Sequence, residues 1–162
     1  MKRLFLCEDE AVLPSIREED LLFPAAPLVK HCVGCFGCWL KTPGKCAIRD
    51  RCGVMPAYLT KCDEFIIISP IWYGGYSQRI KAVLDRSIGY MLPYFRMLHG
   101  EMHHQMRSAH SFALRVYFYG PCDEEERDIA RRVVQGNARN LGASGYSVSF
   151  LASEEAVRRA LA

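Results

Sequence analysis

Short apolar runs recur along the chain with the lengths of strands. They occupy residues 2–6, 20–24, 64–69, 111–120 and 145–151. The run at residues 64–69 has four apolar residues in a row, three of them β-branched. A continuous run of this kind is typical of a strand that is covered on both faces. The pattern therefore predicts five strands.

The apolar period changes to that of helices after the third, fourth and fifth runs. Ser77 can cap a helix whose apolar residues share one face. Those residues are Ile80, Val83, Leu84 and Ile88. Asp123 and Glu126 have the spacing of a capping box and open a second helix, which runs to Gly142. Ser153 caps a last amphipathic helix with acids in its first turn.

Strands that alternate with helices imply crossover connections, which make neighbouring strands parallel and place helices on both faces. We therefore expect a single α/β domain over residues 1–162. Its expected fold is a flavodoxin-like three-layer sandwich, with a five-stranded parallel sheet in the order 2-1-3-4-5. Ligands bind such sheets at the carboxyl ends of the strands. This directs attention to residues 7–19, 70–76 and 120–125.

Composition narrows the class of protein. Half of the 162 residues are hydrophobic, 24% are charged and the formal net charge is +3. These values are ordinary for a globular protein, and they indicate neither nucleic acid nor a membrane as a partner. Acidic residues interrupt the amino-terminal apolar run before it reaches the length of a signal peptide. We expect a cytoplasmic protein, whose cysteines stay reduced and act as metal ligands or redox groups.

Four of the eight cysteines fall within residues 31–46. Cys32, Cys35 and Cys38 have Cys-x2-Cys-x2-Cys spacing, and Cys46 follows in the same loop. A compact loop of this kind can bring several thiolates to one cluster. Zinc held by Cys32, Cys35, Cys46 and Cys52, a redox dithiol, and a stiff loop whose thiols only pack as small hydrophobes are the alternatives. The spacing leaves all of them open.

Two segments together carry a family resemblance. The sequence `CVGCFGCWLKTPGKCAIRD`, followed by `DEFIIISPIWYGGYSQRIKAVLDRSI`, resembles the flavodoxin-like NAD(P)H-dependent FMN reductases and, among them, the iron-sulfur flavoproteins. The resemblance implies an oxidoreductase with FMN, NAD(P)H as the electron donor, and a small-molecule or protein electron acceptor. It also implies a homodimer or homotetramer.

The resemblance assigns site residues as well. It implies a [4Fe-4S] cluster on Cys32, Cys35, Cys38 and Cys46. Its flavin-binding positions lie at the carboxyl edge of the sheet: Pro70, Ile71, Trp72, Tyr73, Gly74, Gly75, Tyr76, Ser77 and Gly120. The glycines would let the backbone approach a flat ring, and the aromatic side chains would pack on its face. No acid-base pair stands out, because the chemistry would belong to the flavin.

The loop after the first strand departs from the family pattern. Flavodoxin-like proteins hold the FMN phosphate there with hydroxyl and N–H groups, whereas this chain has Glu8, Asp9 and Glu10. Pro14 interrupts any long helix, and only about a dozen residues join the first two strands. We expect the first crossover helix to be shortened or absent. A flavin-free protein with a binding or regulatory role is therefore the alternative function.

Residues 90–107 are rich in methionine, aromatic residues and histidine and show no clean period. The stretch predicts an insertion that packs over the 70–76 loop or against a partner subunit. His99 and His103 have the spacing of one helical face, but no Asp or Cys partner is near them in the sequence. Cys122 adds a thiol near the expected site without a base assigned to it.

Overall fold

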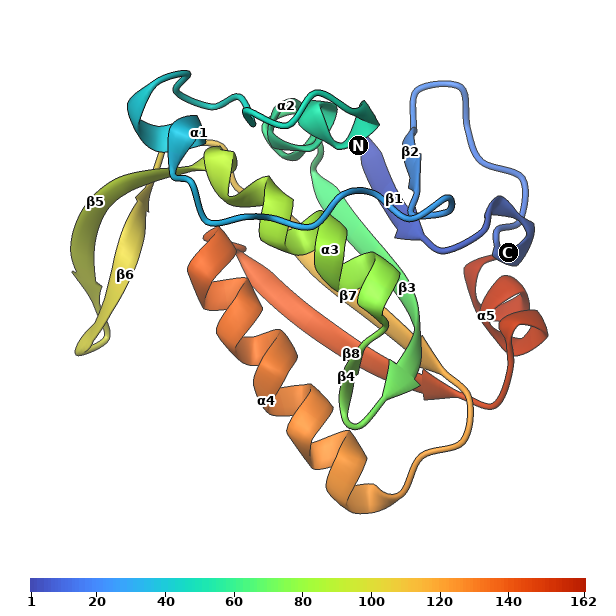
Figure 1. The fold of residues 1–162 in the computed structure, drawn as a ribbon. Coiled ribbons are helices and arrows are strands. Elements are labelled where there is room, and N and C mark those ends of the chain that lie inside the picture. Colours follow the sequence, from blue (N-terminus) through green and yellow to red (C-terminus); the bar gives the residue numbers. More distant parts are fainter.

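The computed structural model describes residues 1–162 and has one parallel sheet at its centre (Figure 1). Five strands form it in the order β2-β1-β3-β7-β8. They are β1 (Arg3–Cys7), β2 (Leu21–Pro24), β3 (Glu64–Trp72), β7 (Ala113–Tyr119) and β8 (Gly145–Leu151). These are the five predicted strands, and all four pairings between them are parallel. The predicted fold class and strand order are confirmed.

Two helices, α3 (Gln78–Arg86) and α4 (Glu124–Leu141), cover one face of the sheet (Figure 1). The main core lies between them and the inward side chains of β1, β3 and β7, among them Leu6, Ile67 and Val116. The predicted caps are present. Ser77 accepts a hydrogen bond from the backbone of Ile80 at 3.4 Å, and Asp123 forms a reciprocal capping box with Glu126.

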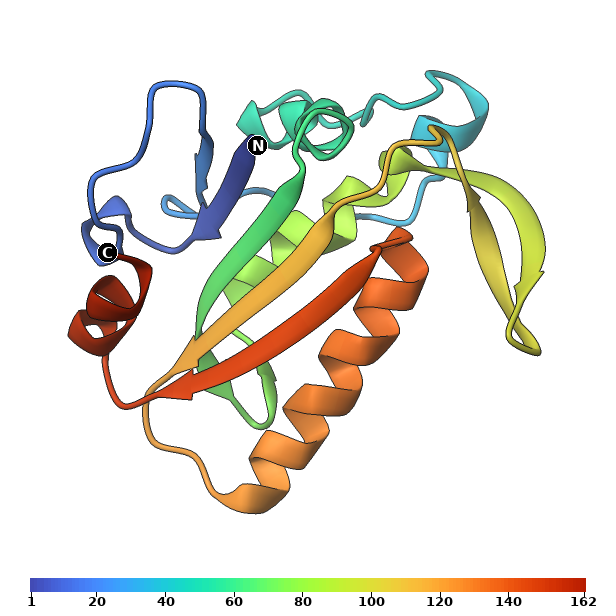
Figure 2. The same ribbon diagram turned by 180° about the vertical axis from the view of Figure 1, so that it is seen from behind.

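The other face is covered only in part (Figure 2). The short helix α5 (Glu154–Leu161) and the three-residue 3-10 helix η1 (Glu10–Val12) pack there. They enclose a second, smaller core that includes Phe5, Ile68 and Val157. The turn η1 is the only helical element between β1 and β2, so the expected loss of the first crossover helix is confirmed.

The crossover from β2 to β3 carries the cysteines. It contains α1 (Gly37–Leu40), the 3-10 helix η2 (Arg51–Val54) and α2 (Met55–Leu59). The indole nitrogen of Trp39 donates hydrogen bonds to the carbonyls of Ile88 and Met91, both at 3.1 Å. Since residues 87–90 form η3 just after α3, the cysteine crossover is anchored at the carboxyl end of that helix.

Residues 91–106 form an antiparallel hairpin of β5 (Met91–Leu98) and β6 (Glu101–Met106). It leads from η3 to the start of β7, so it lies at the amino ends of the strands (Figure 1). The prediction that it packs over the 70–76 loop is wrong, because that loop follows the carboxyl end of β3. The hairpin instead contacts α1 and α4: Trp39 packs on His104, and His103 bonds to Asn140.

The helical spacing read for the histidines is also wrong. His99 lies in the tight turn of the hairpin, with φ of 51°, and His103 lies in β6. The ring of His103 is engaged by Glu101 and Asn140, each at 3.0 Å. The hydrogen bond between His103 and Asn140 fastens the hairpin to α4.

No helix of the chain combines the length and the apolar character needed to cross a bilayer.

Candidate functional site

The loop after β3 is a tight hairpin. Ile71 pairs with Tyr76, and Trp72 pairs with Gly75 of the two-residue strand β4 (Gly75–Tyr76). Tyr73 and Gly74 between them have φ of 49° and 72°. Two successive residues with positive φ are the mark of a two-residue turn whose twist matches the strands it joins. The predicted ring-binding segment is thus a rigid projection at the carboxyl end of β3.

Gly74 is required by packing against α4. A Cβ at this position would lie 2.7 Å from Cβ of Ile129 and 2.9 Å from the carbonyl oxygen of Glu126. The close approach that this glycine allows is therefore to a helix of the same chain. Gly75 is different, because its Cβ would meet only the Trp72 carbonyl oxygen, at 3.6 Å.

The predicted ring-binding side chains divide into an outward and an inward group. Trp72 and Tyr73 project into solvent and are 54% and 91% exposed. Tyr76 is buried and packs on Phe118 with ring centroids 5.3 Å apart. Ser77 is buried as well, and its backbone N–H donates to Oγ of Ser69 at 2.9 Å. The inward pair holds the hairpin in place, and the outward pair is free to contact a ligand.

Trp72 and Tyr73 form one side of an open hollow of about 340 Å³, with Ile71 and Glu126 as its other lining residues. The hollow has an apolar wall and one carboxylate. None of the chain's own side chains fills the space beside the two aromatic rings, so a flat ring has access to them. It is an open shelf for such a ring, and α4 bounds it on one side only.

In flavodoxin-like proteins the turn after β1 holds the flavin phosphate. In this chain the carboxylate of Asp9 already lies in that turn. Oδ1 of Asp9 accepts a hydrogen bond from the backbone N–H of Ala11 at 2.9 Å. Glu8 pairs with Arg79 of α3 at 3.6 Å. A phosphate would meet these carboxylates, and like charges at close range repel. The residues present do not fit the FMN phosphate at this position.

A second hollow, of about 450 Å³, lies at the ends of β7 and β8 beside Gly120. Cys122, Arg127 and Phe150 line it. Nε of Arg127 donates to the sulfur of Cys122 at 3.4 Å, and the guanidinium also lies over the Phe150 ring. Sequence analysis found Cys122 and Gly120 but missed Arg127. Its position in the first turns of the capped helix is the signal that could have found it.

The cysteine loop folds back on itself at α1, where Ala47 approaches Gly37. A Cβ on Gly37 would lie 3.5 Å from the sulfur of Cys35 and 3.4 Å from Cβ of Ala47, the residue after Cys46. Burial raises the pKa of the Cys38 thiol, and the charges of Cys46, Cys32 and Cys35 raise it further. Cys32, Cys35 and Cys46 are therefore close enough to Cys38 for their charges to act on its thiol.

The thiols lie on one loop, but they do not form a closed set of metal ligands. No three histidine, cysteine or acidic side chains are placed as ligands of one metal ion. Cys32 and Cys35 are exposed, Cys46 is half-buried and Cys38 is buried. Cys52, the fourth ligand of the zinc alternative, is fully buried, and burial raises the pKa of its thiol to about 11. Thiolates are suitable donors for a metal centre, but these side chains are not arranged around one metal position, and Cys52 is the least accessible of the five.

Helix α1 of the cysteine loop and the β3–β4 hairpin lie at opposite ends of α3, whereas His31 at the start of the loop lies beside Gln78 in the first turn of α3. Ser77 follows the hairpin directly, whereas α1 contacts η3 at the other end of the helix (Figure 1). Nine helical residues separate the two ends, which is about 13 Å at the rise of an α-helix. Within one chain, α1 with Cys38 is therefore not a neighbour of the hairpin.

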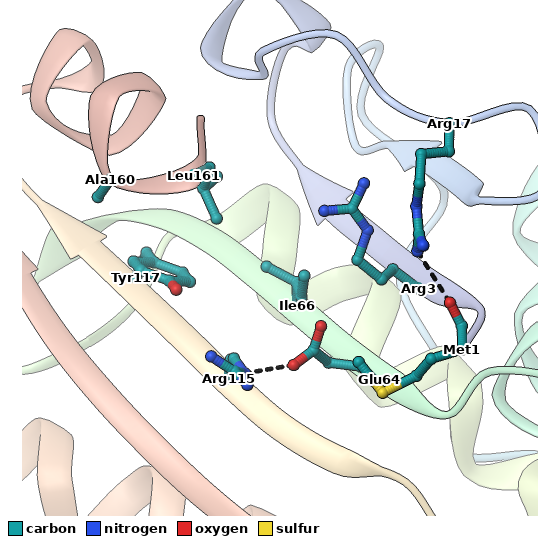
Figure 3. A pocket seen from close by; sticks show the side chains of 9 residues that line it. All are labelled: Met1, Arg3, Arg17, Glu64, Ile66, Arg115, Tyr117, Ala160 and Leu161. Atoms are coloured by element: carbon teal, nitrogen blue, oxygen red, sulfur yellow. Dashed lines mark hydrogen bonds and ion pairs between the residues drawn. The ribbon is translucent and has the colours of Figure 1, made fainter.

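A third hollow, of about 380 Å³, opens on the partly covered face of the sheet (Figure 3). Ile66, Tyr117 and Leu161 form its apolar part. Its charged side chains pair among themselves or with neighbouring backbone: Arg115 with Glu64, and Arg17 with the Met1 carbonyl oxygen (Figure 3). The hollow leaves no unpaired charge to attract a ligand.

The fold and the two sites together define a class: a flavodoxin-like α/β protein with a cysteine-rich second crossover. Comparison by sequence agrees with this. The chain is 37% identical over 79 residues to an iron-sulfur flavoprotein of Methanocaldococcus jannaschii. The match takes in 46% of this chain and 40% of that protein, so the chain spans about two fifths of the relative's length. No protein-family model matches the chain.

Comparison by structure extends the likeness to nearly the whole chain. An FMN-dependent NADH-azoreductase from Bacillus anthracis superposes with a TM-score of 0.56 at 12% identity, over 99% of this chain and 89% of that one. The azoreductase AzrA gives 0.57 at 11% identity, over 99% and 95%. An NADH:FMN oxidoreductase in its apo form gives 0.55 at 11%, over 93% and 75%. These likenesses confirm the fold, and the predicted resemblance is confirmed with them.

Proposed function

We propose that this chain is an electron-transfer protein of the iron-sulfur flavoprotein type, in which Cys32, Cys35, Cys38 and Cys46 hold a [4Fe-4S] cluster. One observation carries the proposal: Cys32, Cys35, Cys38 and Cys46 lie on one short loop that folds back on itself at α1, where Gly37 approaches Cys35 and the residue after Cys46. The similarity in sequence to an iron-sulfur flavoprotein supports it. A cluster held by four thiolates accepts and donates single electrons.

The proposal also includes a flavin, which the oligomeric protein would bind. The fold and the exposed aromatic shelf of Trp72 and Tyr73 favour a flavin ring, and the acidic turn after β1 opposes the FMN phosphate. A bound FMN would need its phosphate held elsewhere, for example by a second copy of the chain in a homodimer or homotetramer. A nicotinamide dinucleotide would be the electron donor, and a small molecule or another protein the acceptor.

A second candidate function is favoured by the Asp9 carboxylate at the phosphate position. In this alternative the chain binds no flavin, its cysteine loop is structural or holds a metal, and the protein has a binding or regulatory role. Flavin content distinguishes the two functions directly. The two functions differ only in whether the site at the carboxyl edge of the sheet binds a flavin, since both use the same cysteine loop.

The test of the cluster is to express the chain anaerobically, reconstitute it with iron and sulfide, and record the visible spectrum with iron, sulfide, zinc and flavin analysis. We expect a broad absorption of the cluster and close to four irons per chain. Cys35→Ser should lose this absorption. The matched control is Cys122→Ser, which removes a thiol outside the loop and should keep it.

Other outcomes separate the alternatives. Zinc in place of iron, lost in Cys52→Ser, would support the zinc site. A colourless wild-type chain without either metal would overturn the cluster proposal. Flavin released from the purified chain on heating would support the oxidoreductase, and a chain that neither contains nor takes up flavin would support the flavin-free alternative.

A further inference from the structure

A fourth hollow, of about 500 Å³, lies between the β5–β6 hairpin and the body of the protein. The hairpin forms one wall, the carboxyl end of α4 forms another, and the segment that enters β8 forms the third. Its polar lining side chains are Arg96, His99, Gln135, Arg139, Ser144 and Tyr146. These elements lie at the amino ends of the strands (Figure 1), so the hollow is separate from the shelf of Trp72 and Tyr73 at the carboxyl ends.

Arg96 enters this hollow from β5. It pairs with His103 of β6 across the hairpin. Residues directly opposite each other in an antiparallel pair place their side chains on the same face. The ring of His103 bonds to Asn140 of α4 at 3.0 Å, so this face of the hairpin turns toward α4. The side chain of Arg96 therefore extends into the space between the hairpin and the helix.

The guanidinium of Arg96 has no partner in the chain. Its Nε is buried and makes no hydrogen bond. The carboxylate on the same face, that of Glu101, pairs with Arg139 and His103 instead. The other arginines that the fold shields in part or fully from solvent all have acidic or backbone partners: Arg3, Arg86, Arg107 and Arg127. Arginine stays charged in proteins, and a shielded charge is costly unless a partner offsets it.

The rest of the lining does not supply that partner. Arg139 is neutralised by Glu101, and no acidic side chain lines the hollow. The carbonyl oxygens of the last turn of α4 do not serve the cation either, because they accept hydrogen bonds from the N–H groups of Gly142 and Ala143. The hollow is therefore positively charged at Arg96, and an anion from outside the chain would complete it.

We propose that this hollow binds a small organic oxyanion, whose carboxylate or phosphate group pairs with the guanidinium of Arg96. The planar fork of arginine matches two oxygens of either group. The amide of Gln135 and the hydroxyl of Ser144 supply further hydrogen bonds, and the exposed ring of Tyr146 supplies a surface for the organic part. The volume is in the range of small-molecule sites. The inference goes beyond the proposed function, because it uses none of the flavin or cysteine residues.

The test titrates the full nitrogen-15-labelled chain, at fixed ionic strength, with phenyl phosphate, benzoate and the uncharged benzyl alcohol, which share a benzene ring. We expect saturable shifts of the amide signals of the hairpin turn and of residues 142–146 with at least one anion, and none with benzyl alcohol. A response to phenyl phosphate alone identifies a phosphate site, and a response to benzoate alone identifies a carboxylate site. If neither anion shifts these signals, the proposal is overturned.

Arg96→Met should raise the dissociation constant of the bound anion at least about tenfold, because charge-assisted hydrogen bonds are lost. Its thermal midpoint should be unchanged or higher, since the substitution removes an unpaired cation. Arg132→Met is the matched control: it removes the same charge from an exposed position on α4 outside the hollow and should keep the wild-type affinity. Unchanged affinity in Arg96→Met, or equal losses in both variants, would overturn the site.

Gln135→Glu decides if Arg96→Met does not fold. It adds a carboxylate to the hollow with little change of shape, so weaker binding of the anion supports the proposal and wild-type affinity overturns it. A second copy of the chain is the other occupant to test. Signals of the hollow that shift with protein concentration in the absence of any probe, in wild type but not in Arg96→Met, would assign Arg96 to an interface and overturn the small-molecule site.

Discussion

At the scale of single residues, Gly74 shows most directly how the carboxyl-edge hairpin is held. Its φ of 72° is costly for any residue with a side chain, and a Cβ would stand 2.7 Å from Ile129. We expect Gly74→Ala to lower the free energy of unfolding by about 2–3 kcal/mol, through overpacking and backbone strain. Urea denaturation followed by circular dichroism measures this.

Gly75→Ala is the matched control for that change. The neighbouring glycine has an ordinary φ, and its Cβ would meet one carbonyl oxygen at 3.6 Å. Its substitution should cost less than about 1 kcal/mol, which is the ordinary range for an unstrained site. Equal losses for the two variants would show that the contact with α4 does not govern the hairpin.

Asp20 predicts a dependence of stability on pH. Burial would raise the pKa of its carboxyl, but hydrogen bonds from Arg3 and Arg17 outweigh this and hold it well below the ordinary 3.8. Because folding lowers the pKa, the contribution of Asp20 to stability is complete above about pH 4 and is lost as the pH falls toward the folded value. The fall in unfolding free energy below pH 4 should therefore be shallower in Asp20→Asn.

At pH 7 the same substitution should lower the free energy of unfolding by about 2–4 kcal/mol, because it leaves Arg3 and Arg17 without their shared carboxylate. Urea denaturation at pH 7 and between pH 2 and pH 5 gives both quantities. Asp128→Asn, at an exposed position on α4, is the control. Parallel pH profiles for wild type and Asp20→Asn would contradict the assignment.

Residue-scale features could be predicted from the sequence where they are local. The caps at Ser77 and Asp123 need only neighbours three positions away, and the structure has both. Gly74 and Ile129 are 55 positions apart, so their contact leaves no local signal in the sequence. The glycine therefore suggested close approach to a ligand instead. Arg86 resembles an ordinary basic residue at a helix end. Only the folded chain shows that its guanidinium donates to the carbonyl oxygens of Lys30 and Ile48, which flank the cysteine loop.

At the scale of elements, short apolar runs predicted the five strands of the main sheet, but no comparable signal marked the β5–β6 hairpin. The pairing register shifts between Met91 and Phe95, which interrupts the period of two. Tyr94, Phe95, Met97 and Met102 are also exposed, so apolar residues do not mark a buried face there. Without either signal the sequence showed an insertion but could not show where it packs.

The turn between β1 and η1 should decide whether the phosphate of a flavin can be held at this edge of the sheet. Asp9 already satisfies the N–H of Ala11, and Glu8 and Glu10 add charge beside it. We expect wild type to bind FMN no more tightly than riboflavin, which lacks the phosphate. The triple variant Glu8→Thr, Asp9→Ser, Glu10→Asn should bind FMN at least about tenfold more tightly than wild type does, since removed repulsion and freed N–H groups favour a dianion.

Quenching of flavin fluorescence measures both affinities. Riboflavin is the internal control, because its affinity should be the same in wild type and in the triple variant. A wild-type chain that binds FMN far more tightly than riboflavin would contradict the claim and would show that other groups hold the phosphate. The missing cradle was visible in the sequence, because three consecutive acids at a strand end are a local signal.

At the scale of the whole molecule, the loss of the first crossover helix leaves part of one sheet face without cover (Figure 2). The residues there are suited to water. Arg115 of β7 is half exposed and pairs with Glu64 of β3 (Figure 3), and Ser147 of β8 is exposed. Under a packed helix these positions would be apolar. The polar residues of these strands therefore match the sparse helical cover on this face of the sheet.

This pairing predicts what happens when the face is made apolar. In the double variant Glu64→Leu, Arg115→Leu, the half-exposed position 115 becomes apolar and extends the apolar surface of the partly buried Tyr117 over the buried Ile66. Patches of several hundred Å² drive association between molecules. We expect the variant to keep its circular dichroism and to form larger assemblies than wild type in sedimentation velocity, whereas Ser147→Ala should leave the mass distribution unchanged. If the double variant sediments as wild type does, a partner already covers this face, and the charged pair serves an interface rather than solvent.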